Sequence, residues 1–334
     1  MSTNPRLVAP FPYFGGKRRV AAEVWSRLGN VRSYVEPFFG SGAVLLARPT
    51  PFSGVETVND KDGLLCNFWR AVQADPAAVA RHADWPVSEC DLHARHLWLV
   101  ERREDITGKL MADPAWFDAQ AAGWWVWGAC SWIGSGWCSG NGPWVRSEGG
   151  LVLGNTGQGI NRKLPHLGDA GRGINRQGGA AFADDASPAG SPAEWLAMLS
   201  ERLRSVRVAC GEWGRVTGDS VLDPMRCGGP VGVFLDPPYD SGNVEYSAGG
   251  AGIAADVRDY AIRIGARPEC RVALCGYDEH DALDAAGWTP HRWKTKGGYS
   301  SQGGENANQS REVVWFSPAC IGARQPSLFE AGAA

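Results

Sequence analysis

The chain has 334 residues, of which 44% are hydrophobic and 21% are charged, and its formal net charge at pH 7 is -3. This composition is typical of a soluble globular protein, and the length allows one large domain or two smaller ones. The near-neutral charge excludes a uniformly basic surface, so a nucleic-acid partner would have to be bound by a local basic patch.

The N-terminus lacks the apolar segment of a secretion signal, and none of the nine cysteines forms a CxxC pair. Both features predict a cytoplasmic protein with reduced thiols. Cys90, His93 and His96 fall at three-residue steps and could share a helix face. A closed zinc site needs a fourth ligand, which is not apparent, and ordinary helical residues explain the spacing. We therefore expect no metal.

The first hundred residues alternate between helical and extended patterns. Residues 19–28 predict a helix, and residues 33–36 predict a short strand. A glycine-rich turn then leads into an apolar helical run at 43–47, and residues 56–59 form a plausible second strand. From about residue 66 to residue 100 the pattern is helical, with Pro76 and Pro86 as breakers.

Residues 119–145 carry no charge and contain six of the sixteen tryptophans. A membrane span is one interpretation of such a segment. Glycine, serine and asparagine crowd its second half, however, and no second apolar segment follows. A buried helix followed by an aromatic-lined loop is the better prediction, and we expect no membrane contact.

Residues 147–192 are rich in glycine, alanine and aspartate, a composition that predicts loops. They contain a short repeat, GQGINR at 157–162 and GRGINR at 171–176. Two interpretations remain open for the basic residues of this segment: contact with DNA phosphates or base edges, or an ordinary charged surface loop. The residues are Arg162, Lys163, Arg172 and Arg176.

After Pro192 regular structure is predicted again. An amphipathic helix at 193–206 is followed by four apolar strands, at 206–209, 231–235, 272–274 and 313–316. Alternating strands and helices indicate α/β architecture. We expect one α/β domain built from residues 1–65 and 193–320, an inserted region at 66–192, and a tail at 321–334.

The stretch VEPFFGSGAVLL at 35–46 combines a strand, a glycine turn and an apolar helix. Glycines allow a tight turn and close approach of a ligand, and a helix N-terminus supplies N–H groups and partial positive charge. Asp60 ends the next strand, where an acid typically accepts hydrogen bonds from a ribose. Together these features suggest an adenosine-containing cofactor, although a G-x-G turn alone is weak evidence.

The stretch VFLDPPYD at 233–240 ends a strand in an acid and two prolines. A strand does not continue through Pro-Pro, because neither residue donates a backbone hydrogen bond. Asp236 is therefore expected at the carboxyl end of its strand, where open α/β sheets bind their ligands.

In their order along the chain, four stretches resemble the Dam-type DNA adenine methylase family of S-adenosylmethionine-dependent amino-methyltransferases. They are PYFGGK at 12–17, VEPFFGSGAVLL at 35–46, VND at 58–60 and LDPPY at 235–239. REVVWFSP at 311–318 also looks like the family's last strand. The resemblance implies a Rossmann-like methyltransferase sheet, mixed, with a reversed edge strand. It also implies double-stranded DNA as the substrate and a target-recognition region at 66–192.

The resemblance also assigns roles by position. Those for S-adenosylmethionine fall on Tyr13, Gly16, Lys17, Glu36, Pro37, Phe38, Gly40, Gly42, Asp60 and Asp236. The family usually has an Asp-Phe pair near the cofactor's adenine, and Glu212-Trp213 is the nearest match here. In the recognition region, only the aromatic and glycine residues at 127–137 match the family's pattern. The resemblance therefore does not indicate which DNA sequence is recognised.

The catalytic assignment falls on Asp236, Pro237, Pro238 and Tyr239. An adenine amino group is a poor nucleophile, because its lone pair is delocalised into the ring. Asp236 and the carbonyl of Pro237 would each accept one amine hydrogen, and the fixed φ of proline would hold that carbonyl in place. Tyr239 would stack on a base rotated out of the duplex.

Other interpretations stay open. A D-P-P-Y strand end also occurs in enzymes that methylate the amine of cytosine or RNA bases. A DNA- or clamp-binding module without catalysis is a further alternative, although intact Asp236, Tyr239 and Gly40 argue against it. In the tail, QPSLF at Gln325–Phe329 resembles the peptide with which bacterial proteins dock on the replication sliding clamp, or it packs on the protein's own surface.

Overall fold

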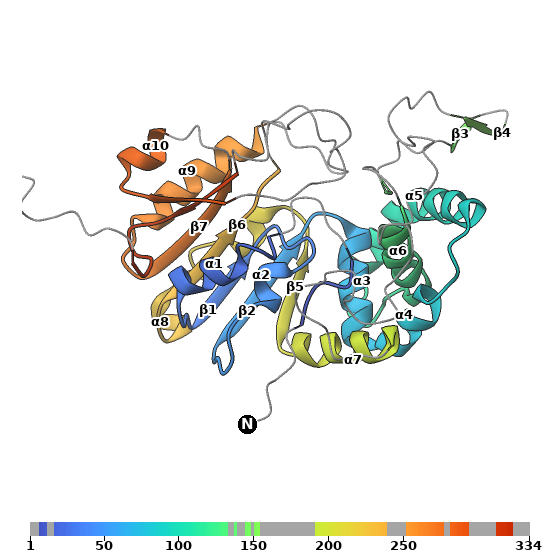
Figure 1. The fold of residues 1–334 in the computed structure, drawn as a ribbon, viewed down its shortest axis with the longest axis horizontal. Helices are drawn as coiled ribbons and strands as arrows, with labels where there is room; N and C mark the ends of the chain where they lie inside the picture. Colours follow the sequence, from blue (N-terminus) through green and yellow to red (C-terminus); the bar gives the residue numbers. More distant parts are fainter. Residues whose placement is uncertain are drawn as a thin grey trace, which may run out of the picture.

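The computed structural model describes residues 7–11, 17–132, 137–138, 144–147, 150–153, 191–238, 252–276, 281–293 and 312–322. A seven-stranded sheet crosses the α/β part of the molecule (Figure 1), in the order β5-β2-β1-β6-β7-β9-β8. Its strands are β1 (Ser33–Glu36), β2 (Val55–Asp60), β5 (Val206–Cys210), β6 (Val231–Leu235), β7 (Cys270–Gly276), β8 (Thr289–Arg292) and β9 (Val313–Phe316). The strands from β5 to β7 are mutually parallel, as the Rossmann-like prediction requires.

The reversed strand is β9, which pairs antiparallel with both β7 and β8. It lies one position in from the edge rather than at the edge, because the last strand of the chain inserts between β7 and β8. The edge strand itself, β8, was not predicted. It contains Pro290, and its residues alternate between intermediate and exposed, as an edge strand tolerates.

Helices connect the strands. They are α1 (Ala21–Leu28), α2 (Ala43–Leu46), α3 (Gly63–Ala74), α4 (Pro76–Ala83), α5 (Glu89–Ala112), α6 (Ala119–Ser131), α7 (Pro192–Leu203), the 3-10 helix η2 (Trp213–Val216), α8 (Pro224–Cys227), α9 (Ile253–Gly265) and α10 (Asp281–Ala285). Five of the longer ones begin after a side chain that accepts an N–H of their first turn, which fixes where each starts. These caps are Asp62, Asp75, Ser88, Asp118 and Ser191.

Both faces of the sheet are covered by apolar side chains. On β1, Tyr34 joins one buried cluster and Val35 joins the other, as the alternation of a strand requires. The cluster around Val35 continues into α9, and the cluster around Tyr34 continues into α3, α5, α6 and α7. Figure 1 shows these last helices gathered beside β5. The helices that follow the second strand therefore share a core with the sheet.

The apolar segment at 119–145 begins with α6, whose Trp125 and Trp127 are buried. The helix packs against α3 and α4. None of the described helices is long and apolar enough to cross a membrane.

The predicted boundary after residue 65 falls inside α3, and α7 packs against both α3 and α4. The division into a catalytic domain and a recognition region stays a prediction. Among the described residues of the predicted loops at 147–192 is the strand β4 (Gly150–Leu153), which pairs antiparallel with β3 (Trp144–Ser147).

Candidate active site

The carboxyl ends of β1 and β6 lie side by side at the centre of the sheet. Val35 of β1 is paired with Val233 of β6, and each of the two strands ends within a few residues of this pair. From β1 the chain turns into α2, and from β6 it passes to Asp236. The order of the strands reverses direction between β1 and β6, which is where open α/β sheets place their ligand crevice.

Lys17 connects the N-terminal segment to this point. Its Nζ lies 3.0 Å from Oδ1 of Asp236, and the two side chains are 4% and 21% exposed. Burial alone would lower the pKa of Lys17, but the charge of Asp236, followed by Cys275 and Glu312, outweighs it and raises the pKa. The neighbouring Asp236 therefore favours the cationic form of Lys17.

The glycine turn after β1 is held by the end of β2. The N–H of Gly40 donates to Oδ2 of Asp60 at 2.9 Å. Gly42 has φ +67°, and a Cβ at this position would lie 2.8 Å from the ring of Phe39. The turn thus requires glycine at position 42 both for its backbone conformation and for the close approach of Phe39.

The N–H groups of this turn were expected to be available to a ligand, but several serve the protein instead. Besides the bond from Gly40, the N–H of Gly42 donates to the carbonyl of Phe39 at 2.8 Å. The helix that follows, α2, has only four residues, and the N–H of Leu46 at its end donates to the carbonyl of Gly42 at 2.9 Å. A one-turn helix has few N–H groups to spare, because its own closure uses them.

Glu36 is directed into the protein interior. Its side chain is buried, and Oε2 accepts the hydroxyl hydrogen of Tyr34 at 2.9 Å. Burial raises its pKa well above the usual value. The structure therefore places the Glu36 side chain in the interior at the end of β1, paired with Tyr34.

Asp60 lies at the end of β2, as predicted, and is part-buried. Oδ1 accepts the N–H of Asp62 at 3.0 Å, in addition to the bond from Gly40 to Oδ2. Burial raises the pKa of Asp60 to about 6. The neighbouring Asn59, which was not predicted, donates to the carbonyls of Pro37 at 3.0 Å and Gly211 at 2.9 Å. It ties the ends of β1, β2 and β5 together.

Phe38 and Trp213 pack against each other near the glycine turn. Their ring centroids are 6.3 Å apart with an interplanar angle of 31°, and Trp213 also packs edge-on against Tyr260 at 5.1 Å. Glu212, beside Trp213, is exposed and forms an ion pair with Lys61 at 2.8 Å. The structure thus brings the Glu212-Trp213 pair to the same end of the sheet as the glycine turn.

Of the remaining predicted site residues, two are described and the others are not. Pro237 is buried and Pro238 is half-buried directly after Asp236. Outside the described residues lie Tyr13, Gly16, Arg162, Lys163, Arg172, Arg176, Tyr239 and the segment Gln325–Phe329.

Two residues beside Asp236 were missed by sequence reasoning. The thiol of Cys275, on β7, is hydrogen-bonded to Asp236, and burial raises its pKa well above the usual value. Glu312, directly before β9, is close enough for its charge to act on both Lys17 and Asp236. No local motif indicates Cys275, whereas Glu312 belongs to the stretch at 311–318 that resembled the family's last strand.

The cysteine-histidine grouping on α5 does not assemble a metal site in the described structure. Cys90 is exposed, and Nδ1 of His96 accepts the N–H of Cys138 at 3.2 Å. The ring of His96 also stacks on Trp132, with centroids 5.2 Å apart. Across the described ranges, no three His, Cys, Asp or Glu side chains form a group that could hold a metal ion.

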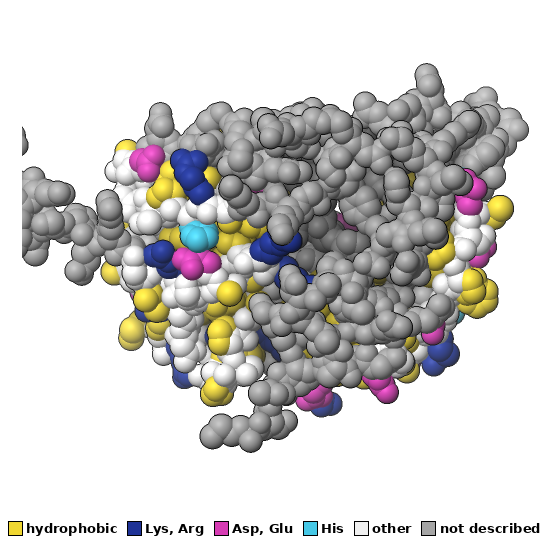
Figure 2. Space-filling view, viewed as in Figure 1, with side chains coloured by type: hydrophobic (Ala, Val, Ile, Leu, Met, Phe, Trp, Pro, Cys, Tyr) yellow, Lys and Arg dark blue, Asp and Glu magenta, His cyan; other side chains and the backbone are white. Residues whose placement is uncertain are grey.

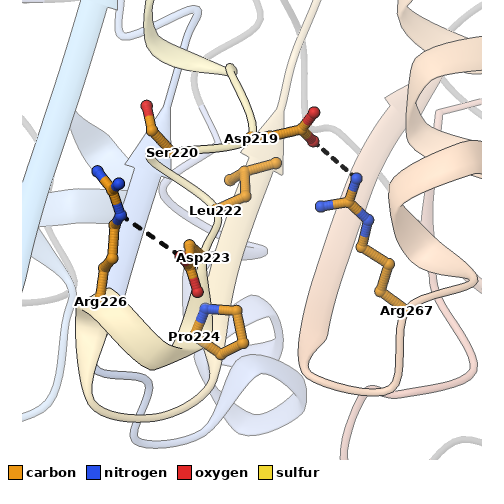
Figure 3. A pocket seen from close by; sticks show the side chains of 7 residues that line it. All are labelled: Asp219, Ser220, Leu222, Asp223, Pro224, Arg226 and Arg267. Atoms are coloured by element: carbon orange, nitrogen blue, oxygen red, sulfur yellow. Dashed lines mark hydrogen bonds and ion pairs between the residues drawn. The ribbon is translucent and has the colours of Figure 1, made fainter.

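A surface hollow lies elsewhere, away from the carboxyl ends of β1 and β6. It is lined by residues that precede β6 and β7, among them Asp219, Asp223, Arg226 and Arg267 (Figure 3). Arg267 pairs with Asp219 at 2.7 Å and Arg226 with Asp223 at 3.5 Å, so its charges are matched internally. On the face seen in Figure 2, the coloured basic and acidic side chains are scattered rather than gathered into one basic patch.

Residues 13–89 match the family model described as D12 class N6 adenine-specific DNA methyltransferase. A search of curated proteins found no match. The matched segment contains Lys17, the glycine turn and Asp60, the same parts that converge on the end of the sheet. The match over residues 13–89 and the mostly parallel sheet support a Dam-type adenine-specific DNA methyltransferase.

Proposed function

We propose that the enzyme transfers a methyl group from S-adenosylmethionine to the exocyclic amino group of an adenine flipped out of double-stranded DNA. The observation that carries this proposal is the convergence of Lys17 and Asp236, 3.0 Å apart, at the strand ends beside the glycine turn. A carboxylate held at this place can meet a substrate amine next to a cofactor bound at the turn.

The residues present fit an adenosine-containing cofactor. Phe38 and Trp213 offer two half-buried rings for an adenine. A carboxylate has about four lone-pair sites, and the N–H groups of Gly40 and Asp62 each use one on Asp60. Acceptor capacity remains on Asp60 for ribose hydroxyls. Glu36 supports the site from beneath rather than touching the cofactor, because its side chain is buried against Tyr34.

When bound, S-adenosylmethionine supplies a methyl group activated by its positive sulfonium. The protein's own part is orientation. Asp236 accepts one hydrogen of the adenine amine and the carbonyl of Pro237 accepts the other, which directs the nitrogen lone pair out of the ring plane. Pro238, half-buried, restricts the backbone after that carbonyl. A direct transfer of this kind needs alignment more than a strong base.

The base has to leave the duplex to reach Asp236, because the amine is otherwise engaged in pairing. Flipping costs a few kcal/mol, which stacking and hydrogen bonding in the enzyme offset. Tyr239 is the proposed stacking residue, since it follows the two prolines directly. Aromatic stacking contributes about 1–3 kcal/mol per base in single-strand binding systems.

DNA contacts outside the crevice are proposed for Arg162, Lys163, Arg172 and Arg176, within a target-recognition region at 66–192. Their support is chemical: guanidinium and ammonium groups on glycine-rich backbone suit phosphates and base edges. Docking of Gln325–Phe329 on a sliding clamp stays a prediction from the pattern of the tail.

One experiment tests base and methyl donor together. The protein is incubated with duplex DNA and S-adenosylmethionine carrying a deuterated methyl group, and the DNA is digested to nucleosides for mass spectrometry. The proposal predicts the label on the amino nitrogen of adenine and on no other nucleoside. Label on cytosine, or only on RNA offered in parallel, would favour the other amine substrates. Binding of S-adenosylmethionine without any labelled nucleoside would favour an inactive binding module.

A further inference from the structure

Two cysteines lie together at the carboxyl ends of β2 and β5. Cys66 is in the first turn of α3, and Cys210 is the last residue of β5. The thiol of Cys66 donates to the carbonyl oxygen of Asp60 at 3.5 Å and to that of Ala209 at 3.6 Å. Asp60 is the residue of β2 that pairs with Cys210, and Ala209 directly precedes Cys210. The sulfur of Cys66 therefore lies against the backbone on both sides of the Asp60–Cys210 pair.

The side chains of the two cysteines are on the same face of the sheet. Cys66 is buried within the cluster around Tyr34, and the half-buried Cys210 packs against that cluster. The two thiols are hydrogen-bonded to each other. A buried thiol in contact with a solvent-accessible one is the arrangement of a resolving and an attacking cysteine.

Cys210 is the more reactive of the two. The hydrogen bond from Cys66 lowers the pKa of Cys210, which raises the fraction of nucleophilic thiolate at neutral pH. The guanidinium of Arg215, which donates to the carbonyl of Cys210 at 2.5 Å, adds a positive charge nearby. The same hydrogen bond and burial raise the pKa of Cys66. Cys66 is thus shielded from solvent oxidants and reacts only with a sulfur beside it.

The cysteine pair is connected to the proposed cofactor site through Asp60. Oδ1 of Asp60 accepts the N–H of Asp62 at 3.0 Å, and Asp62 caps α3 by accepting the N–H of Leu64 at 3.0 Å. The backbone N–H of Cys66 donates to the carbonyl of Asp62 at 2.9 Å. Movement of Cys66 toward Cys210 therefore acts on the turn that fixes the carboxylate of Asp60.

We propose that Cys66 and Cys210 form a thiol–disulfide switch: oxidation by a hydroperoxide joins the two sulfurs and weakens binding of S-adenosylmethionine beside Asp60. This regulation rests on the proposed role of Asp60 in the cofactor site. A disulfide is about 2.0 Å long, shorter than a hydrogen bond between two sulfurs, so its formation draws the start of α3 and the end of β5 together. The carbonyl of Asp60 also loses the donor that the thiol of Cys66 supplies.

The hydroperoxide is the two-electron oxidant in this reaction. The thiolate of Cys210 attacks a peroxide oxygen, so that an S–O bond forms and the O–O bond breaks. With hydrogen peroxide, the leaving hydroxide takes up a proton and becomes water. The sulfur of Cys66 then attacks the sulfenic sulfur of Cys210, the S–S bond forms, and the hydroxyl leaves as a second water with the proton of Cys66. Two thiols and one hydrogen peroxide give one disulfide and two waters, and a dithiol reductant restores the thiols.

Peptide mapping of the full-length chain tests the disulfide directly. Trypsin, which cuts after lysine and arginine, places Cys66 in the peptide 62–70 and Cys210 in the peptide 208–215, each without another cysteine. The protein is treated with hydrogen peroxide, its remaining thiols are alkylated, and the digest is analysed by mass spectrometry. We expect the two peptides to be joined by a bond that dithiothreitol splits. Absence of the joined peptides would overturn the proposal.

Calorimetric titration with S-adenosylmethionine tests the effect on the cofactor site. Affinity should fall about tenfold or more in the oxidised protein, within the usual range for coupling between two sites, and dithiothreitol should restore it. Cys210→Ser should keep its affinity after peroxide treatment. Cys66→Ser, whose hydroxyl keeps a donor for the carbonyl of Asp60, should be insensitive in the same way and serves as a second variant if Cys210→Ser is unstable.

Cys227→Ser is the matched control. Cys227 is also half-buried, and its thiol donates to the carbonyl of Val221 at 3.6 Å, but it lies on α8, before the amino end of β6. This variant should lose affinity on oxidation as the wild type does.

The outcomes separate the switch from the function on which it rests. Joined peptides with unchanged affinity would overturn the switch and leave the proposed function intact. An equal loss of affinity in oxidised Cys210→Ser would also overturn it, because another group would then be responsible. Failure of the reduced wild type to bind S-adenosylmethionine would remove the proposed function, and this regulation with it.

Discussion

The backbone N–H of Gly40 donates to Oδ2 of Asp60 at 2.9 Å, so the acid at the end of β2 holds the turn that follows β1. Asp60 is thereby both part of the scaffold and part of the proposed cofactor site. The loop and the acid form one unit, and a change in either should affect the other.

The glycine turn should be intolerant of a side chain at position 42. Gly42→Ala places a Cβ in left-handed backbone, 2.8 Å from the ring of Phe39. We expect the free energy of unfolding to fall by at least about 1 kcal/mol, measured by urea denaturation. Gly108→Ala is the matched control, because Gly108 lies inside α5 with open space around its Cβ position. That change should be neutral or stabilising by up to about 1 kcal/mol, and equal losses in the two variants would contradict the account.

Breaking the ion pair from the side of Lys17 should destabilise the fold. Lys17→Met leaves Asp236 without its cation in a mostly buried place. Loss of one partner of a fully buried pair costs about 3–5 kcal/mol. Since Asp236 is 21% exposed, we expect about 2 kcal/mol in urea denaturation. Adding Asp236→Asn to Lys17→Met should recover part of this loss, and strictly additive losses would show that the pair is not coupled.

The raised pKa of Asp60, about 6, predicts opposite pH effects on stability and on cofactor binding. The folded protein holds the Asp60 proton more tightly than the unfolded chain, whose aspartate pKa is about 3.9. The stabilisation from this group is therefore present below pH about 4 and is lost as pH rises through about 6.

Cofactor affinity should move the other way, because the ionised carboxylate is the better acceptor for ribose hydroxyls. Calorimetric titration with S-adenosylmethionine between pH 5 and 8 should show affinity falling as pH drops below about 6. Asp60→Asn should bind weakly and lose this dependence. A variant that keeps the same pH dependence would assign it to another group.

The local sequence pattern was sufficient to predict much of the fold. The turn at Gly40 and Gly42, and the strand that stops before Pro237, follow from glycine and proline chemistry within a few residues. The edge strand β8 was missed because Pro290 and half-exposed residues weaken its pattern, and only pairing with β9 makes it a strand.

Side-chain direction was harder to predict than position. Glu36 lies where expected, at the end of β1 before the glycine turn, yet its side chain is paired with Tyr34, because alternation along β1 directs both to the same face. Cys275 and Glu312 come to Asp236 through strand order, which no local stretch encodes. Only the full pairing of β6, β7 and β9 brings them together.

The central claim is that Asp236 accepts a hydrogen of the adenine amine. Asp236→Asn tests it most directly, because the amide keeps the size of the side chain and removes the charge. Single-turnover methylation of duplex DNA, with binding of S-adenosylmethionine measured in parallel, should show no detectable transfer and retained cofactor binding. Transfer within about tenfold of the wild-type rate would contradict the account, since that is less than a charge-assisted hydrogen bond contributes.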